Sequence, residues 1–229
     1  MNGLASRYRG ILSRVEAAAS ACNRTGEVTL IAVSKNQPIE VIEELYRLGH
    51  RDFGENYVQE LVSKAPALEL RGCTGIRWHF IGHLQTNKVK ILLPFVYSVH
   101  SVDSEKLGRE LAKRAQSRLS IFLEVNLEEE PAKTGVAPEK VPALVKVLAE
   151  MPELNLHGLM CVPTPMAGAN GTAFLTLREL ESRCRPSTQG KLSMGMTSDF
   201  EVAIREGATH IRVGTAIFGP RPVAVQKPL

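Results

Sequence analysis

Several features that commonly announce a function are missing from this chain. No apolar run approaches the ~18 residues of a membrane-spanning helix, and the longest, residues 91–99, is interrupted by Pro94. No lysine- or arginine-rich tract concentrates the net charge of +4, which argues against nucleic-acid binding but is compatible with a small anion such as a phosphate ester. G-x-G-x-x-G, Walker A and G-x-S-x-G sequences are absent, which disfavours nucleotide-binding folds and acyl-transfer hydrolases.

Metal and redox motifs are also lacking. The four cysteines are widely spaced and form no C-x-x-C pair, which indicates reduced thiols in the core of a cytosolic protein. His79 and His83 have the spacing of a helical metal pair, but residues 78–82 are predicted to be a strand, where that spacing does not converge, and no acidic third ligand is nearby. We therefore expect no metal site, and we expect His79 to be a hydrogen-bonded residue of the fold.

What is present is a repeated alternation of apolar runs and amphipathic segments. A chain of 229 residues is long enough for one large domain, and we predict a single domain over residues 1–229. Strands alternating with helices imply a parallel sheet, and eight such units favour an α/β fold of the (β/α)8 TIM-barrel type over an open doubly wound sheet. The predicted strands are residues 28–34, 51–54, 76–82, 95–100, 120–126, 155–162, 191–196 and 210–214.

The helical segments complete this pattern. An extra amphipathic helix over residues 4–22 precedes the barrel; its arginines faintly resemble an organelle presequence, but a helix packed on the domain is the simpler interpretation. A capping box, Ser198-x-x-Glu201, predicts the start of a late helix, and the Pro- and Gly-rich residues 163–172 predict a mobile loop over a site. The other predicted helices are residues 38–48, 56–65, 85–93, 104–118, 138–150 and 172–184.

In such a barrel the functional site lies at the carboxyl ends of the strands, and phosphate groups often bind after strands 7 and 8. Those ends read LSMGM at residues 192–196 and RVGT at residues 212–215, which supply small residues, backbone N–H groups and hydroxyls.

The first strand ends at Lys35. A lysine there is usually a solvated charge, but it could also form an imine with an aldehyde cofactor. That role needs its ordinary pKa of ~10.4 lowered by about 3, by burial beside a cation such as Arg212 or Lys133. Other polar residues at inferred strand ends are Glu55, Asn56, His79, His83 and Asn126.

Several of these segments match one family. They read AVSK at 32–35, FGENYVQE at 53–60, WHFIGHLQ at 78–85, GLM at 158–160, LSMGM at 192–196 and RVGTAIFG at 212–219. Through them the chain, from about residue 4 to residue 221, resembles the pyridoxal phosphate homeostasis proteins, which are single-domain relatives of the alanine racemase barrel (fold type III).

The resemblance implies a Schiff base between Lys35 and pyridoxal 5'-phosphate. It also implies that Ser193, Gly214 and Thr215 hold the phosphate, that Arg212 faces the pyridine nitrogen, and that Asn56 and Met194 lie near the ring. Many relatives carry a second lysine where this chain has Gln37, which puts cofactor transfer through that position in doubt.

Three functions compete. The first is a cytoplasmic carrier that buffers the cofactor and delivers it to apo-enzymes without turnover. The second is a racemase or lyase using the same cofactor; racemisation needs an acid/base on each face of the substrate, and of the four tyrosines only Tyr57 lies near an inferred strand end. The third, a phosphate-ester isomerase, gives Lys35 no special role. We expect the carrier, acting as a monomer.

Overall fold

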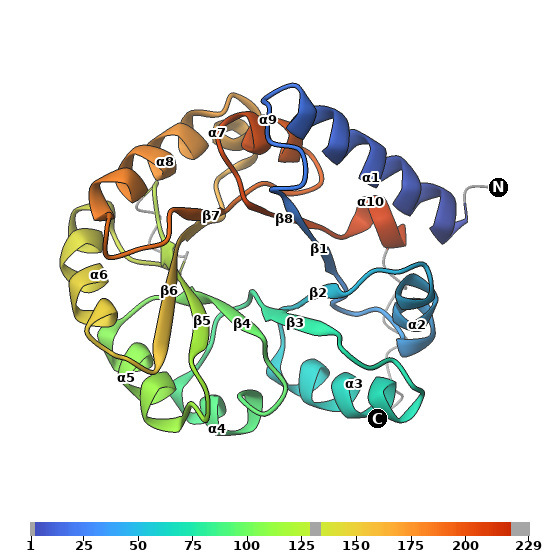
Figure 1. The fold of residues 1–229 in the computed structure, drawn as a ribbon, viewed down its shortest axis with the longest axis horizontal. Helices are drawn as coiled ribbons and strands as arrows, with labels where there is room; N and C mark the ends of the chain where they lie inside the picture. Colours follow the sequence, from blue (N-terminus) through green and yellow to red (C-terminus); the bar gives the residue numbers. More distant parts are fainter. Residues whose placement is uncertain (1–2, 129–133, 221–229) are drawn as a thin grey trace, which may run out of the picture.

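The chain folds into a closed barrel of eight parallel strands, in sequence order, as the alternating pattern predicts (Figure 1). The computed structural model describes residues 3–128 and 134–220. Each strand pairs with the next, and β8 pairs with β1 to close the ring, with Leu30 opposite Ile211. The strands are β1 (Thr29–Val33), β2 (Asp52–Glu55), β3 (Arg77–Phe80), β4 (Ser98–Val102), β5 (Leu119–Val125), β6 (Leu154–Cys161), β7 (Lys191–Ser193) and β8 (His210–Val213).

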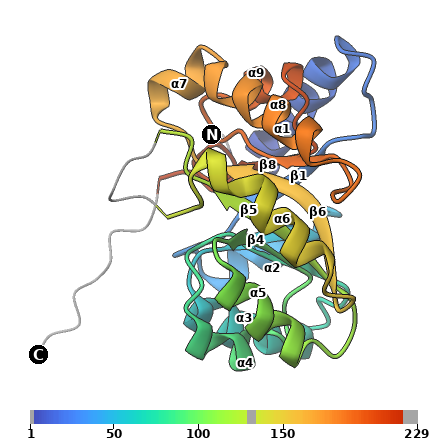
Figure 2. The ribbon, with the colours of Figure 1, turned by 90° about the vertical axis from the view of Figure 1, so that its left-hand side faces the viewer.

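Helices surround the strands on the outside of the barrel, and seen from the side they flank it on opposite sides (Figures 1 and 2). They are α1 (Leu4–Ser20), α2 (Ile39–Arg47), α3 (Val58–Leu70), α4 (Val89–Leu92), α5 (Glu105–Arg114), α6 (Val141–Ala149), α7 (Pro165–Ala169), α8 (Thr172–Cys184), α9 (Phe200–Arg205) and α10 (Thr215–Phe218). Short 3-10 turns, η1 (Thr86–Lys88) and η2 (Pro138–Lys140), precede α4 and α6.

The first helix is part of the domain, as its apolar spacing predicts. α1 buries one face made of Leu4, Tyr8, Ile11, Val15 and Ala19. It packs beside α9 and α10, the last helices of the described chain (Figure 1). Arg7 adds polar contacts there, because its Nε and Nη2 atoms donate to the carbonyl oxygens of Ile217 and Phe218 at 2.8 and 3.1 Å.

Aromatic and imidazole rings fill part of the barrel interior, where branched aliphatic side chains are more usual. The ring of His100 stacks on Phe122 with centroids 4.3 Å apart, and His79 and His210 meet it edge-on at 5.1 and 5.7 Å. His79 and His100 are 1% and 0% exposed. The ring nitrogens of His79 lie 3.0 Å from His100 Nε2 and from Asp52 Oδ1, which confirms that His79 is a hydrogen-bonded residue of the fold.

Among the differences between the structure and the sequence expectations, four concern β4, β7, α9 and residues 163–172. β4 spans Ser98–Val102, later than predicted, and β7 ends at Ser193 because Gly195 takes a positive φ of 92° that turns the chain. The predicted capping box is wrong: Asp199 is the N-cap residue of α9, and Glu201 pairs with Arg14 instead.

The predicted loop over residues 163–172 is the fourth difference, since it contains the short helix α7. Thr164 caps that helix by accepting a hydrogen bond from the N–H of Ala167. Its hydroxyl also donates to Glu128 Oε1 at 2.5 Å, which ties the start of α7 to the segment after β5.

Two further sequence expectations concern the cysteines and membrane-spanning segments. The four cysteines are free, three of them are buried, and burial raises the pKa of Cys161 to about 12. In residues 3–128 and 134–220, no helix is long and apolar enough to cross a membrane.

Candidate functional site

A cavity of about 360 Å³ opens at the carboxyl ends of β1, β2 and β8 and collects most of the predicted site residues. Lys35, Asn56, Arg212, Gly214 and Thr215 all line it. Its lining, taken over the described residues, contains no aspartate or glutamate, so its charged groups are cationic. The full lining is Val33, Lys35, Gln37, Asn56, Ile81, Val162, Met196, Thr197, Ser198, Arg212, Gly214, Thr215 and Gly219.

Lys35 sits in the turn directly after β1 and is half-buried. The preceding residue, Ser34, makes two hydrogen bonds: its N–H donates to the carbonyl of Gly54 at 2.9 Å, and its hydroxyl donates to Glu55 Oε1 at 2.7 Å. The following residue, Asn36, has a positive φ of 58° and donates its N–H to Glu60 Oε2 at 2.8 Å. The backbone on both sides of Lys35 is therefore held in one conformation.

Arg212 enters the same cavity from β8 and is 4% exposed. Its Nη1 donates to the Ser193 hydroxyl and its Nη2 to the carbonyl of Cys161, both at 2.8 Å. Burial lowers the pKa of Arg212, but a guanidinium keeps its proton in proteins. A fixed positive charge with aligned N–H groups consequently borders the cavity.

Asn56 follows β2 and lines the wall next to Ile81. Its Oδ1 atom is buried and accepts no hydrogen bond, which is costly unless a bound molecule supplies a donor. Gly82 allows this arrangement, because a Cβ atom there would lie 2.1 Å from the carbonyl oxygen of Asn56. The glycine after β3 is thus required by close backbone approach.

The ends of β7 and β8 form the opposite wall. α10 begins at Thr215, so its first N–H groups have no partner within the helix. A Cβ atom at Gly214 would lie 3.3 Å from the carbonyl oxygen of Val33, which leaves little room beside the backbone there. The turn after β7 is fixed by Asp199, whose Oδ1 accepts the N–H of Met196 at 2.6 Å.

Ser193 and Met194 are not brought into the cavity. Both are 0% exposed, and the Ser193 hydroxyl contacts Arg212 and His100 beneath the cavity floor. The chain reaches the cavity at Met196, Thr197 and Ser198. Met196 ends the strand segment predicted from the sequence, whereas Thr197 and Ser198 are not among the predicted site residues. The signal that could have found them is Gly195, whose positive φ turns the chain before the cavity lining begins.

The remaining polar candidates lie elsewhere. Glu55 is completely buried under the Lys35 turn. Asn126 and His83 line a neighbouring cavity of about 290 Å³, and Lys133 lies outside the described residues. His83 contacts Asp103 at 3.6 Å, whereas His79 points into the barrel towards His100, so the two histidines do not converge. Among residues 3–128 and 134–220, no cluster of three or more His, Cys, Asp or Glu side chains could hold a metal ion.

Tyr57, the tyrosine nearest a strand end, is 51% exposed and does not line the Lys35 cavity. Gln37 does line it and is 8% exposed. This is the position for which the sequence analysis noted a second lysine in many relatives.

Known proteins are similar to this chain over most of its length. The family model for the alanine racemase N-terminal domain matches residues 11–222. A pyridoxal phosphate homeostasis protein of Pseudomonas aeruginosa is 40% identical, over 96% of this chain and 97% of its own length. The chain belongs to the pyridoxal phosphate homeostasis protein family. A member from Aquifex aeolicus is 41% identical, over 94% of this chain and 97% of its own.

Solved structures agree with this family membership. PipY of Synechococcus elongatus, solved with PLP bound, superposes with a TM-score of 0.79 at 35% identity, covering 90% of this chain and 100% of that one. Alanine racemase from Corynebacterium glutamicum gives a TM-score of 0.68 at 14% identity, covering 95% of this chain and 62% of that one. The latter likeness supports the racemase-type barrel fold and nothing further.

Proposed function

We propose that this protein binds pyridoxal 5'-phosphate reversibly through the Lys35 amine, buffers it and delivers it to apo-enzymes without catalytic turnover. The observation that carries the proposal is that Lys35, Arg212 and the Gly214–Thr215 turn line one cavity. The relatives named for pyridoxal phosphate homeostasis, and PipY with PLP bound, support the choice of ligand.

The residues of the cavity fit this cofactor. A phosphate requires several donors and close backbone approach. Thr215, Thr197 and Ser198 carry hydroxyls on one wall, beside Gly214. The unpartnered Asn56 Oδ1 offers an acceptor to a hydroxyl of a bound ligand. Ser193 and Met194 are fully buried and do not line the cavity, so in this assignment they support the phosphate side and the ring side from below rather than by direct contact.

Arg212 favours holding the cofactor over transforming a substrate. The bound cofactor supplies an electrophilic aldehyde, and its ring withdraws electrons strongly only when the ring nitrogen is protonated. Arg212 can only donate hydrogen bonds, so it stabilises the unprotonated nitrogen. Racemisation needs a second acid/base opposite Lys35. Tyr57, the tyrosine that lies nearest a strand end, is outside the cavity and cannot take that role there.

Reduction with borohydride tests the binding site. The purified protein loaded with pyridoxal phosphate should be yellow, and borohydride should fix the cofactor on the peptide that contains Lys35. Lys35→Ala should lose this adduct, whereas Lys113→Ala, on the exposed face of α5, should retain it. An adduct confined to another lysine would refute the assignment.

A separate measurement tests the absence of turnover. The loaded protein is incubated with L- and D-amino acids in deuterated water, and exchange of the α-proton is followed by NMR. The carrier function predicts less than one exchange per bound cofactor. Sustained exchange over many cycles would establish the racemase-type alternative instead.

A further inference from the structure

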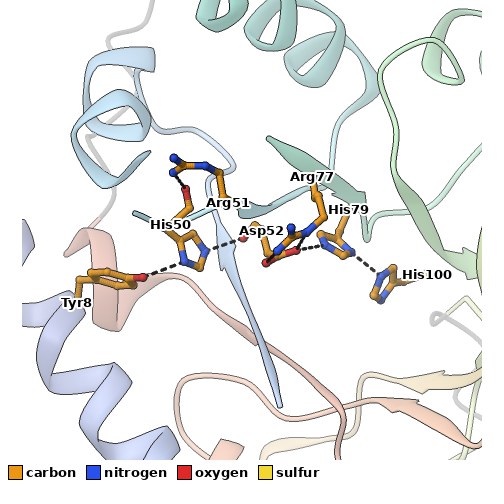
Figure 3. Close-up of polar contacts among 7 residues, drawn as sticks. All are labelled: Tyr8, His50, Arg51, Asp52, Arg77, His79 and His100. Atoms are coloured by element: carbon orange, nitrogen blue, oxygen red, sulfur yellow. Dashed lines mark hydrogen bonds and ion pairs between the residues drawn. The ribbon is translucent and has the colours of Figure 1, made fainter. Parts of the chain in front are cut away.

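A continuous chain of buried hydrogen bonds crosses the barrel from the amino end of β2 to Arg212. His79 Nε2 lies 3.0 Å from Asp52 Oδ1, and His79 Nδ1 lies 3.0 Å from His100 Nε2. His100 Nδ1 lies 2.8 Å from the Ser193 hydroxyl, which also lies 2.8 Å from Arg212 Nη1. Figure 3 shows the first half of this path, from Asp52 through His79 to His100.

With neutral imidazoles, the Asp52 carboxylate fixes the direction of every bond. The ionised carboxylate can only accept, so His79 donates to it from Nε2 and accepts on Nδ1 from His100 Nε2. His100 Nδ1 is then an acceptor, and the Ser193 hydroxyl donates to it while accepting from Arg212 Nη1. This assignment uses one hydrogen per bond.

The surroundings of the two rings support the neutral forms. Burial lowers the pKa of His79 and, even more strongly, that of His100. At the far end, Arg77 Nε donates to Asp52 Oδ1 at 2.7 Å, which keeps that carboxylate ionised and therefore able to accept.

The hydrogen-bonded path surrounds Arg212 with neutral polar groups instead of a directly paired carboxylate. In the part of the chain that the structure describes, no carboxylate lies within salt-bridge distance of Arg212, whose guanidinium donates to the Ser193 hydroxyl and to the Cys161 carbonyl. A buried guanidinium must be hydrogen-bonded to be tolerated. Ser193 accordingly decides which way Arg212 Nη1 points, and Asp52 is the carboxylate at the end of the path.

We propose that Asp52, His79, His100 and Ser193 are positioning residues, whose one-way hydrogen bonds hold Arg212 in the orientation that presents its other N–H groups to the cavity. The inference rests on the proposed function for one point, namely that Arg212 donates to the ring nitrogen of pyridoxal phosphate. A break anywhere in the path should then alter the environment of the bound ring, even when the altered residue never touches the cofactor.

The direction of the bonds is tested on the cofactor-free protein. Long-range 15N–1H NMR spectra of histidine-labelled protein report which ring nitrogen carries the proton. We expect His79 and His100 to be neutral with their protons on Nε2 at pH 7. A proton on Nδ1 of either ring, or a protonated ring, would overturn the proposed path whether or not the protein binds pyridoxal phosphate.

The link to Arg212 is tested by cofactor titration of two variants. Ser193→Ala removes the acceptor of Arg212, and we expect about tenfold weaker binding of pyridoxal phosphate with a shifted absorption band, as for the loss of one hydrogen bond to a charged group. Asp52→Asn keeps an acceptor for His79 but removes the charge at the far end, and we expect a smaller shift of the same band.

A matched control separates positioning from general damage. Ser98→Ala removes another buried serine hydroxyl, one that donates to the Ser120 carbonyl outside the path, and should leave the absorption band and the affinity unchanged. If Ser193→Ala behaves like Ser98→Ala, Ser193 does not position Arg212. If Ser193→Ala does not fold, the band of Asp52→Asn decides, and an unshifted band refutes the proposal. If the wild-type protein shows no cofactor band at all, it is the proposed function that fails.

Discussion

The ammonium of Lys64 lies 2.8 Å from Oε1 of Glu55, directly beneath the turn that carries Lys35. Glu55 is 0% exposed and the Lys64 side chain 9% exposed, so the pair is buried. Lys64 also donates to the Ser34 carbonyl at 2.9 Å, and the Ser34 hydroxyl donates to Glu55 Oε1. Burial raises the pKa of the Glu55 carboxyl, and the charge of Lys64 opposes that rise. Lys64, which also pairs with Glu60 of α3 at 2.5 Å, thus ties both the end of β2 and the segment after β1 to α3.

Replacing Lys64 by methionine should therefore destabilise the protein strongly. Removing one partner of a buried ion pair leaves the other charge uncompensated, which costs about 3–5 kcal/mol in free energy of unfolding. Urea denaturation followed by circular dichroism measures this change. Lys113→Met, on exposed α5, is the control and should change the free energy of unfolding by less than about 0.5 kcal/mol. A loss for Lys64→Met as small as that of the control would show that the pair contributes nothing.

Acid should destabilise the protein partly through His210. Burial lowers the pKa of His210 to about 3, and the charge of the nearby Lys191 acts in the same direction. In the unfolded chain the pKa is about 6.5, so below that pH the unfolded state binds more protons than the folded state. The stabilising contribution is complete above pH ~6.5 and is lost as the pH falls towards 3, amounting to about 2 kcal/mol between pH 7 and pH 5.

The check is the free energy of unfolding at several pH values for the wild type and His210→Gln. The variant cannot take up this proton on unfolding, so its stability should fall less steeply between pH 7 and pH 5. Gln116→Ala, an exposed substitution that changes no titrating group, should keep the wild-type slope. Identical slopes for the wild type and His210→Gln would contradict the prediction.

Gly82→Ala should damage both stability and the cofactor site. The added Cβ would lie 2.1 Å from the Asn56 carbonyl oxygen, so the backbone of Asn56 must move away from its place in the cavity wall. We expect the free energy of unfolding to fall by about 1–3 kcal/mol and the binding of pyridoxal phosphate to weaken. Gly10→Ala is the control, because no atom lies within 4 Å of a Cβ there, and in the middle of α1 it should stabilise the protein by roughly 0.5–1 kcal/mol. Unchanged affinity in Gly82→Ala would show that the position of Asn56 is unimportant for binding.

Much of the fold follows from local pattern. Apolar runs and helix boundaries such as Pro38 and Gly49 specify eight βα units, and the closed barrel follows from their number and order. The places of Lys35, Asn56 and Arg212 in one cavity follow from the rule that strand ends of a barrel meet at one face.

The remaining features depend on contacts between residues far apart in the sequence. The partners of the Ser193 hydroxyl are His100 and Arg212, and the former lies 93 residues away in the chain. Lining by Thr197 and Ser198 depends on the backbone turn at Gly195, and the N-cap of α9 depends on Asp199 bonding back to Met196. No periodicity encodes such tertiary hydrogen bonds, so the sequence could not predict that the Ser193 hydroxyl, which the resemblance assigns to the phosphate, lies 2.8 Å from both Arg212 Nη1 and His100 Nδ1.

Arg7 of α1 should influence the phosphate-binding side of the cavity from a distance. Its guanidinium donates to the carbonyl oxygens of Ile217 and Phe218, which end the short helix that Thr215 begins. Arg7→Met keeps the apolar stem but removes both donors, so α10 should be less firmly held, at a cost of about 1–2 kcal/mol in free energy of unfolding.

Comparison of two ligands reveals whether this anchoring matters for the phosphate. Because Thr215 and Gly214 are proposed to hold the phosphate, Arg7→Met should weaken binding of pyridoxal phosphate several-fold more than binding of pyridoxal, which lacks that group. Arg9→Met, an exposed neighbour on α1, should leave both affinities unchanged. Equal losses for the two ligands would mean that α10 supports the whole cavity rather than its phosphate side, and no loss for either would remove α1 from any role in binding.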